Sequence, residues 1–179
     1  CGALRDFDLD GRPDVLLSPQ SPDGSGTSEL WLFLNHDDGG AVRFDKLVVP
    51  TPIFNARACA VGDYDGDGRP DVALTGATLG RGALLLHNTG DAAAFFEDKS
   101  SLLPLDPVSG APPTMAAGWI DLDGDGRLDL LASLAPLSIN PFGPCADDPA
   151  LGFSCPANPP YTTLGPILFH NCGDRFERK

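Results

Sequence analysis

The chain has 179 residues and a formal net charge of −13, because 25 acidic residues outnumber 12 Lys and Arg. This balance argues against nucleic-acid binding, since phosphates require clustered basic side chains. No apolar stretch approaches the roughly 18 residues that span a bilayer, so no transmembrane segment is expected.

The motif Asp-x-Asp-x-Asp-Gly-x-x-Asp occurs three times along the chain. It begins at Asp6, Asp63 and Asp121, and the starts lie 57 and 58 residues apart. Self-similarity at a fixed period of this order indicates a repeat architecture such as a solenoid or a propeller.

Each motif is predicted to be a loop that binds Ca²⁺. Side chains at positions 1, 3 and 5 point inward, and glycine at position 6 permits a sharp turn. Position 7 is expected to offer its backbone carbonyl, with its side chain free outside, and the carboxylate at position 9 closes the shell. All-oxygen coordination of this kind suits Ca²⁺ better than Mg²⁺. The three predicted sites comprise Asp6, Asp8, Asp10, Arg12 and Asp14; Asp63, Asp65, Asp67, Arg69 and Asp71; and Asp121, Asp123, Asp125, Arg127 and Asp129.

Other interpretations of the loops are weaker. Zinc is disfavoured because no thiol or imidazole occurs at ligand spacing. An EF-hand requires Glu at position 12 and flanking helices, whereas position 12 is Leu17, Leu74 or Ala132. Solvated acidic turns without an ion are disfavoured because four carboxylates within nine residues repel one another.

Four short apolar runs in each repeat predict four strands. The first run precedes the loop and the second follows it. The third run ends at an Asn, and the fourth contains an aromatic residue and comes after a Gly. Asn and Gly between apolar runs are typical of hairpins, and four antiparallel strands per repeat form a propeller blade. The runs are 2–4, 15–17, 30–35 and 43–45 in the first repeat, 58–61, 72–74, 84–88 and 95–97 in the second, and 115–120, 130–132, 167–171 and 175–177 in the third.

The predicted fold is therefore all-β, with three four-stranded antiparallel propeller blades. The blades are expected at 1–50 with a truncated first strand, at 51–108, and at 109–179 with a Pro-rich insertion at about 136–165. A closed propeller has four to eight blades, and a stack of repeats needs caps or partners. We therefore expect further blades or a protein partner to complete the propeller. The insertion is either a partner contact or decoration without such a role.

The second motif is the fullest, and reads Val61-Gly62-Asp63-Tyr64-Asp65-Gly66-Asp67-Gly68-Arg69-Pro70-Asp71-Val72. Together with the later Leu-Leu-x-Asn-x-Gly and Phe, it resembles the FG-GAP/VCBS repeat of integrin-α-like calcium-binding β-propellers, and the resemblance covers essentially the whole chain. It implies a propeller of about seven blades with Ca²⁺ in the loop between the first two strands. It also implies an extracellular adhesion or recognition role, in some members beside a secreted enzyme. The three repeats of this sequence are fewer than the blades of a propeller of this family.

Five cysteines bear on the cellular compartment. Cys145 and Cys155 lie in the Pro-rich insertion, where a disulfide is predicted. Such a bond indicates an oxidising, extracytoplasmic location: secreted, on the cell surface or periplasmic. Cys59 is expected to be a buried apolar residue. Cys1 is left open between pairing with Cys59, pairing with Cys172, and a lipidated terminus.

No catalytic motif for acyl transfer, nucleotide binding or zinc proteolysis is present, so an enzyme is not expected. His87 and His170 are interpreted as structural residues at strand ends, and His36 as a solvated residue in a turn. Trp31 and Trp119 are expected to fill space between blades.

The leading hypothesis is a non-catalytic calcium-binding propeller module for extracytoplasmic protein–protein interaction or adhesion. The alternatives are an accessory domain or subunit of a secreted or membrane-associated enzyme complex, and a carbohydrate-binding module with a glycan as partner.

Overall fold

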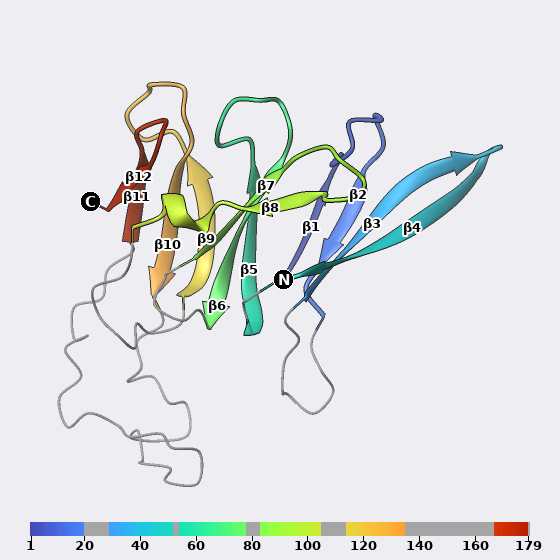
Figure 1. Cartoon of the computed structure of the whole chain (residues 1–179), viewed down its shortest axis with the longest axis horizontal. Helices are drawn as coiled ribbons and strands as arrows, with labels where there is room; N and C mark the ends of the chain where they lie inside the picture. Colours follow the sequence, from blue (N-terminus) through green and yellow to red (C-terminus); the bar gives the residue numbers. More distant parts are fainter. Residues whose placement is uncertain (20–28, 52–53, 78–82, 105–113, 135–166, 179) are drawn as a thin grey trace, which may run out of the picture.

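The computed structural model describes residues 1–19, 29–51, 54–77, 83–104, 114–134 and 167–178. In this part of the chain twelve strands form three four-stranded antiparallel sheets, and within each sheet neighbouring strands follow each other in sequence (Figure 1). The prediction of an all-β chain with three four-stranded blades is confirmed.

We call the sheets A, B and C in chain order. Sheet A contains β1 (Gly2–Arg5), β2 (Asp14–Leu17), β3 (Glu29–Asp38) and β4 (Ala41–Pro50). Sheet B contains β5 (Phe54–Gly62), β6 (Asp71–Ala77), β7 (Leu84–Asn88) and β8 (Phe96–Asp98), followed by a 3-10 turn η1 (Ser100–Leu102). Sheet C contains β9 (Thr114–Ile120), β10 (Asp129–Leu134), β11 (Ile167–Asn171) and β12 (Phe176–Arg178).

Sheet B lies between the other two sheets, and each of its faces is buried against a neighbour (Figure 1). Successive side chains of a strand point to opposite faces, so alternate residues of sheet B fill two separate cores. The core between sheets A and B includes Leu16, Leu30, Leu32, Leu34, Val72, Leu74, Leu84 and Leu86. The core between sheets B and C includes Ala73, Leu85, Leu130, Ala132, Ile167 and Phe169.

The hairpin of sheet A is longer than its sequence pattern predicts. β3 and β4 pair from Glu29 with Pro50 to Asp38 with Ala41. The turn falls at Gly39 and Gly40, whose φ angles of 64° and 93° are accessible to glycine at little cost. His36 therefore lies inside β3, so its assignment to a turn was wrong. The cause is the Gly-Gly pair, which places the turn beyond His36 and lets the strand continue.

Close packing between sheets B and C depends on Trp119 and Gly62. The Trp119 ring stacks on Tyr64 with 6.2 Å between centroids, and its indole N–H donates to the Ala60 carbonyl at 3.1 Å. A Cβ at Gly62 would lie 2.8 Å from the Trp119 ring, so a side chain there would displace it. The prediction for Trp119 is confirmed.

Trp31 does not occupy an equivalent position between the described sheets. It is half-buried on the face of sheet A that points away from sheet B, opposite Leu17 in the register. Lys46 Nζ lies 3.4 Å from its ring centroid, a cation–π arrangement. Trp31 was expected to fill space between blades. In the described structure it does not, because no described sheet covers this face of sheet A.

A disulfide joins Cys1, next to β1, to Cys59 in β5, with 5.7 Å between the Cα atoms. Of the alternatives left open for Cys1, the structure therefore shows pairing with Cys59. The bond also corrects the expectation that Cys59 is only a buried apolar residue. Cys172 is free and half-buried. The predicted bond between Cys145 and Cys155 lies outside the described residues. The observed bond closes a 58-residue separation across two blades.

We predict that replacing both Cys1 and Cys59 by Ser lowers the free energy of unfolding by about 2–4 kcal/mol, because the unfolded chain gains freedom when this loop opens. Chemical denaturation under non-reducing conditions measures the change. Cys172→Ser is the control for loss of a thiol and should change stability little. Equal stability of the double variant and the wild type would contradict the prediction.

Candidate metal-binding loops

The three aspartate motifs form loops of the same shape. Each connects the first two strands of its sheet, between β1 and β2, β5 and β6, or β9 and β10. At position 6, Gly11, Gly68 and Gly126 have φ angles of 89°, 87° and 85°. Position 4 is also left-handed in all three loops, even where loop 1 has Leu9 at φ 61° instead of glycine. The repeated sequence therefore gives a repeated backbone.

The carboxylate at position 1 holds the loop closed from inside. Asp63 Oδ1 accepts the N–H groups of Gly66 at 2.7 Å and Asp67 at 3.0 Å, and Asp63 Oδ2 accepts that of Gly68 at 2.8 Å. Equivalent bonds, to the N–H groups at positions 5 and 6, are made by Asp6 and Asp121. Backbone hydrogen bonds thus fix where these carboxylates lie.

The carboxylate at position 9 is buried and connects two segments of its blade. Asp14, Asp71 and Asp129 have exposed fractions of 0%, 0% and 2%. In loop 2, Asp71 Oδ2 accepts the Tyr64 N–H at 3.1 Å and Oδ1 accepts the Asn88 N–H at 2.8 Å. The other two blades repeat both bonds. The loop is therefore attached to the third strand as well as to the first two.

Several carboxylates of each loop converge on one point. Their oxygens lie within 4.8 Å of one another in three groups: Asp6, Asp8 and Asp14; Asp63, Asp65 and Asp67; and Asp121, Asp123 and Asp125. Burial raises the pKa of Asp8, and the nearby charge of Asp14 raises it further. Carboxylates placed this close repel one another when charged, and a hard cation would relieve that repulsion. Oxygen-only donor sets fit Ca²⁺.

The side chain of the arginine at position 7 was expected to be free outside the loop. This expectation is wrong, because the side chain bonds to the loop and to the third strand. Arg12 Nε donates to the Asn35 carbonyl at 3.0 Å, and its Nη2 donates to Asp10 Oδ2 at 2.6 Å. Arg69 and Arg127 make the same pair of contacts in their blades. The physical reason is the adjacent position-5 carboxylate, which holds the guanidinium over the end of the third strand.

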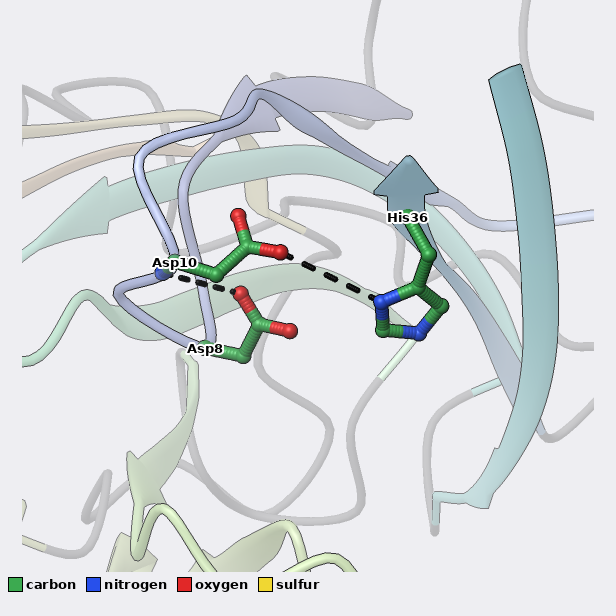
Figure 2. A group of neighbouring side chains, drawn as sticks. All are labelled: Asp8, Asp10 and His36. Carbon is green, nitrogen blue, oxygen red and sulfur yellow. Dashed lines mark hydrogen bonds and ion pairs between the residues drawn. The ribbon is translucent and has the colours of Figure 1, made fainter. Parts of the chain in front are cut away.

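A histidine lies beside each loop, although no imidazole occurs at ligand spacing along the sequence. His87 Nδ1 lies 3.2 Å from both Asp65 Oδ2 and Asp71 Oδ1. His170 Nδ1 lies 3.1 Å from Asp129 Oδ1. Figure 2 shows His36 reaching from β3 toward Asp10 of loop 1, with 3.9 Å between Nδ1 and Oδ2. Strand pairing, not sequence spacing, brings the imidazoles to the loops.

Two of these histidines occur in further groups of potential ligands. The structure groups His36 with Asp8 and Asp10 (Figure 2), and His87 with Asp65 and Asp71. Because each of these two imidazoles shares one aspartate, Asp8 or Asp65, with the oxygen cluster of the same loop, it adds a nitrogen donor at the side of that cluster. In the described geometry it acts as a hydrogen-bond or ion-pair partner of the carboxylates.

Asp71 has the largest shift among the described carboxyl groups. Burial raises the pKa of Asp71 to about 6, although the N–H groups of Asn88 and Tyr64 favour its charged form. The charge of Asp65 adds to the rise, and His87 opposes it. In the absence of a cation, burying this carboxylate as an anion therefore costs stability.

Repeated four-stranded blades with one acidic loop each define a β-propeller repeat protein. Residues 6–74, from the first loop into β6, match the family model of FG-GAP-like repeats. Over these residues the match confirms the resemblance that the sequence pattern predicts. No curated protein matches the chain. In the described part of the chain no helix is long and apolar enough to cross a membrane.

The pKa of Asp71 predicts a pH dependence of the ion-free protein. The folded-state pKa of about 6 lies above the ordinary value of 3.8, so the folded state binds more protons between these values. The free energy of unfolding should therefore fall as pH rises from about 4 to about 6. Denaturation in a chelator at several pH values measures this slope.

Asp71→Asn should reduce that slope, whatever its effect on absolute stability, because the amide does not titrate. Asp91→Asn, in an exposed turn, is the matched control for losing one carboxyl group. A wild-type slope retained in Asp71→Asn would contradict the assignment to Asp71.

Proposed function

We propose that this chain is a calcium-binding, non-catalytic propeller module that mediates protein–protein contact outside the cytoplasm. The observation that carries the proposal is the convergence of carboxylates in three loops of the same shape. Each loop would hold one Ca²⁺ through the carboxylates at positions 1, 3, 5 and 9 and the carbonyl at position 7. The ion would supply the positive charge that these carboxylates lack.

The role proposed for the ion is architectural. It would join a loop whose position-9 carboxylate already bonds to the third strand, and so restrain three strands of a blade at once. Extracellular modules bind Ca²⁺ with dissociation constants of about 10⁻⁴ to 10⁻³ M. At ~1 mM free ion, each site would add about 0.4–1.4 kcal/mol to the folded state. Together, three such sites would contribute a substantial part of the free energy of unfolding of an ordinary domain.

Two observations support a location outside the cytoplasm. The Cys1–Cys59 disulfide is of a kind that persists in oxidising compartments. FG-GAP-like repeats are also typically extracellular, where calcium reaches millimolar concentration. The outer faces of sheets A and C carry exposed apolar side chains such as Phe44 and Leu122, which suit contact with a protein partner or with further blades.

The proposal predicts that calcium raises the melting temperature and that a chelator lowers it. Asp65→Ala should reduce the calcium-dependent increase by roughly one third, because one of three similar sites is lost. Differential scanning calorimetry with and without calcium measures both effects.

Asp91→Ala is the control, since it removes an exposed carboxylate outside the loops and should keep the full calcium response. A melting temperature that is the same in calcium and in chelator would refute the proposed ion binding. Direct titration of the wild-type chain with Ca²⁺ in a calorimeter gives the stoichiometry, expected to be three.

A further inference from the structure

A groove of about 620 Å³ lies between the first two aspartate loops, where strands β1 and β5 end. Both loops lie at the same edge of the molecule (Figure 1). The walls of the groove include Arg5, Leu9 and Pro13 from sheet A, and Val61 and Pro70 from sheet B. Its volume is in the range of ligand-binding sites, and the sheets on both of its sides belong to the described structure.

The corresponding place between sheets B and C is filled by Trp119. Gly62 precedes the first aspartate of loop 2, and a Cβ there would lie 2.8 Å from the Trp119 ring. Between sheets A and B, Arg5 stands at the repeat position of Gly62, and Val61 stands at that of Trp119. The smaller Val61 leaves open the volume that the indole occupies in the other junction. The groove therefore depends on residues in which the two junctions differ.

Leu9 is a second departure from the repeat at the wall of this groove. It is the one non-glycine residue with a positive φ in the described part of the chain, at 61°. Gly66 and Gly124 hold the same position in loops 2 and 3, with φ angles of 78° and 76°. A left-handed backbone is less favourable for leucine than for glycine, and the Leu9 side chain is 57% exposed. A strained residue that presents an apolar side chain to water is typical of a binding surface.

Arg5 contributes an unpaired positive charge to the groove. Its side chain is exposed and makes no hydrogen bond or ion pair among the described residues. The other charged residues that line the groove have partners: Arg12 bonds within its own blade, and Asp6 and Asp63 accept N–H groups of their own loops. A free guanidinium pairs best with a carboxylate, which it can bind through two parallel hydrogen bonds.

We propose that this groove binds an extended segment of a protein partner that carries an acidic side chain between apolar side chains. The carboxylate would pair with Arg5. The apolar side chains on either side of it would pack on Leu9 and on Val61.

The exposure of the walls favours a peptide segment over a small molecule. Leu9, Pro13 and Gly68 are all exposed, whereas a small-molecule site buries most of the surface of its ligand. A groove between two loops leaves room for a chain to enter and to leave. The inference rests on the proposed role in protein contact and names the chemistry of the segment that is bound.

Nuclear magnetic resonance of the ¹⁵N-labelled chain in millimolar calcium tests the proposal. The probe is a pool of blocked pentapeptides with Asp at the centre and Leu, Ile, Val or Phe on either side of it. The backbone amide signals of Arg5, Leu9 and Val61 should shift as the pool is added. A matched pool with Asn at the centre should bind about tenfold more weakly, because it lacks the charge that pairs with Arg5.

Three variants separate recognition from structure. Arg5→Gln should weaken binding of the Asp pool about tenfold and leave binding of the Asn pool unchanged. Arg57→Gln is the matched control, because Arg57 is an exposed arginine of β5 outside the groove, and it should bind both pools as the wild type does. Leu9→Gly gives loop 1 the residue of the other two loops. It should keep or raise the melting temperature, since glycine suits this φ, and yet bind the Asp pool several-fold more weakly.

Equal binding of the two pools, an Arg5→Gln effect no larger than that of Arg57→Gln, or full binding by Leu9→Gly would each overturn the inference. Isobutyrate is the small-molecule probe: if it binds as tightly as the Asp pool, a peptide segment is the wrong occupant.

The melting temperature in calcium distinguishes this inference from the proposed ion binding. A chain that responds to calcium but to neither pool would overturn the inference and leave calcium binding standing. A chain that binds the Asp pool through Arg5 without responding to calcium would support the groove and overturn the proposed ion binding.

Discussion

The position-9 carboxylate of each loop is buried, and its two oxygens accept backbone N–H groups from two different segments of one blade. In blade 2, Asp71 binds the N–H of Tyr64 in the loop and that of Asn88 at the end of β7. A carboxylate accepting such bonds is satisfied although it is hidden from water. Without it, the hydrogen bonds that attach the loop to the third strand would be reduced to those of the arginine at position 7 and the asparagine amide.

These bonds continue from one blade to the next. The peptide group of Tyr64 gives its N–H to Asp71 and offers its carbonyl to Asn171 of sheet C, whose own N–H binds Asp129. Phe7 bridges sheets A and B in the same way. Hydrogen bonds in a low-dielectric interior polarise one another, so the row is stronger when all its members are present. A cation in a loop would restrain the same peptide that the next blade binds. Metal binding of the kind proposed would therefore be linked to blade stacking.

The sequence was enough to predict the strands, the loops and their glycines, because each depends on residues close together along the chain. Strand periodicity, left-handed positions such as Gly68, and repeated aspartates are all local signals. The contacts of Arg69 and His87 were missed, since they require β7 to lie beside the loop. The Cys1–Cys59 bond likewise depends on blade order in space.

Asparagine was recognised from sequence as a marker at the end of the third strand, but its role depends on a partner 81 residues away. Asn88 donates its backbone N–H to Asp71, accepts from Arg69 at its carbonyl, accepts from Gly90 at Oδ1, and donates Nδ2 to Phe7 O and Pro70 O. Aspartate could not make the two Nδ2 bonds, and an apolar residue of similar size would leave buried carbonyls unpaired.

Asn35 repeats the bonds within its own blade, to Asp14, Arg12 and Pro13, without the bond across blades that Asn88 and Asn171 make in the described structure. Blade 1 thus makes the bonds of its own loop without a preceding blade among the described residues, and one amide hydrogen of Asn35 remains for such a neighbour. Because that donor is positioned by bonds internal to the blade, its direction does not depend on the neighbour. Pre-positioned polar groups of this kind lower the entropic cost of association, which is why one repeated residue can serve both the fold of a blade and the order of the stack.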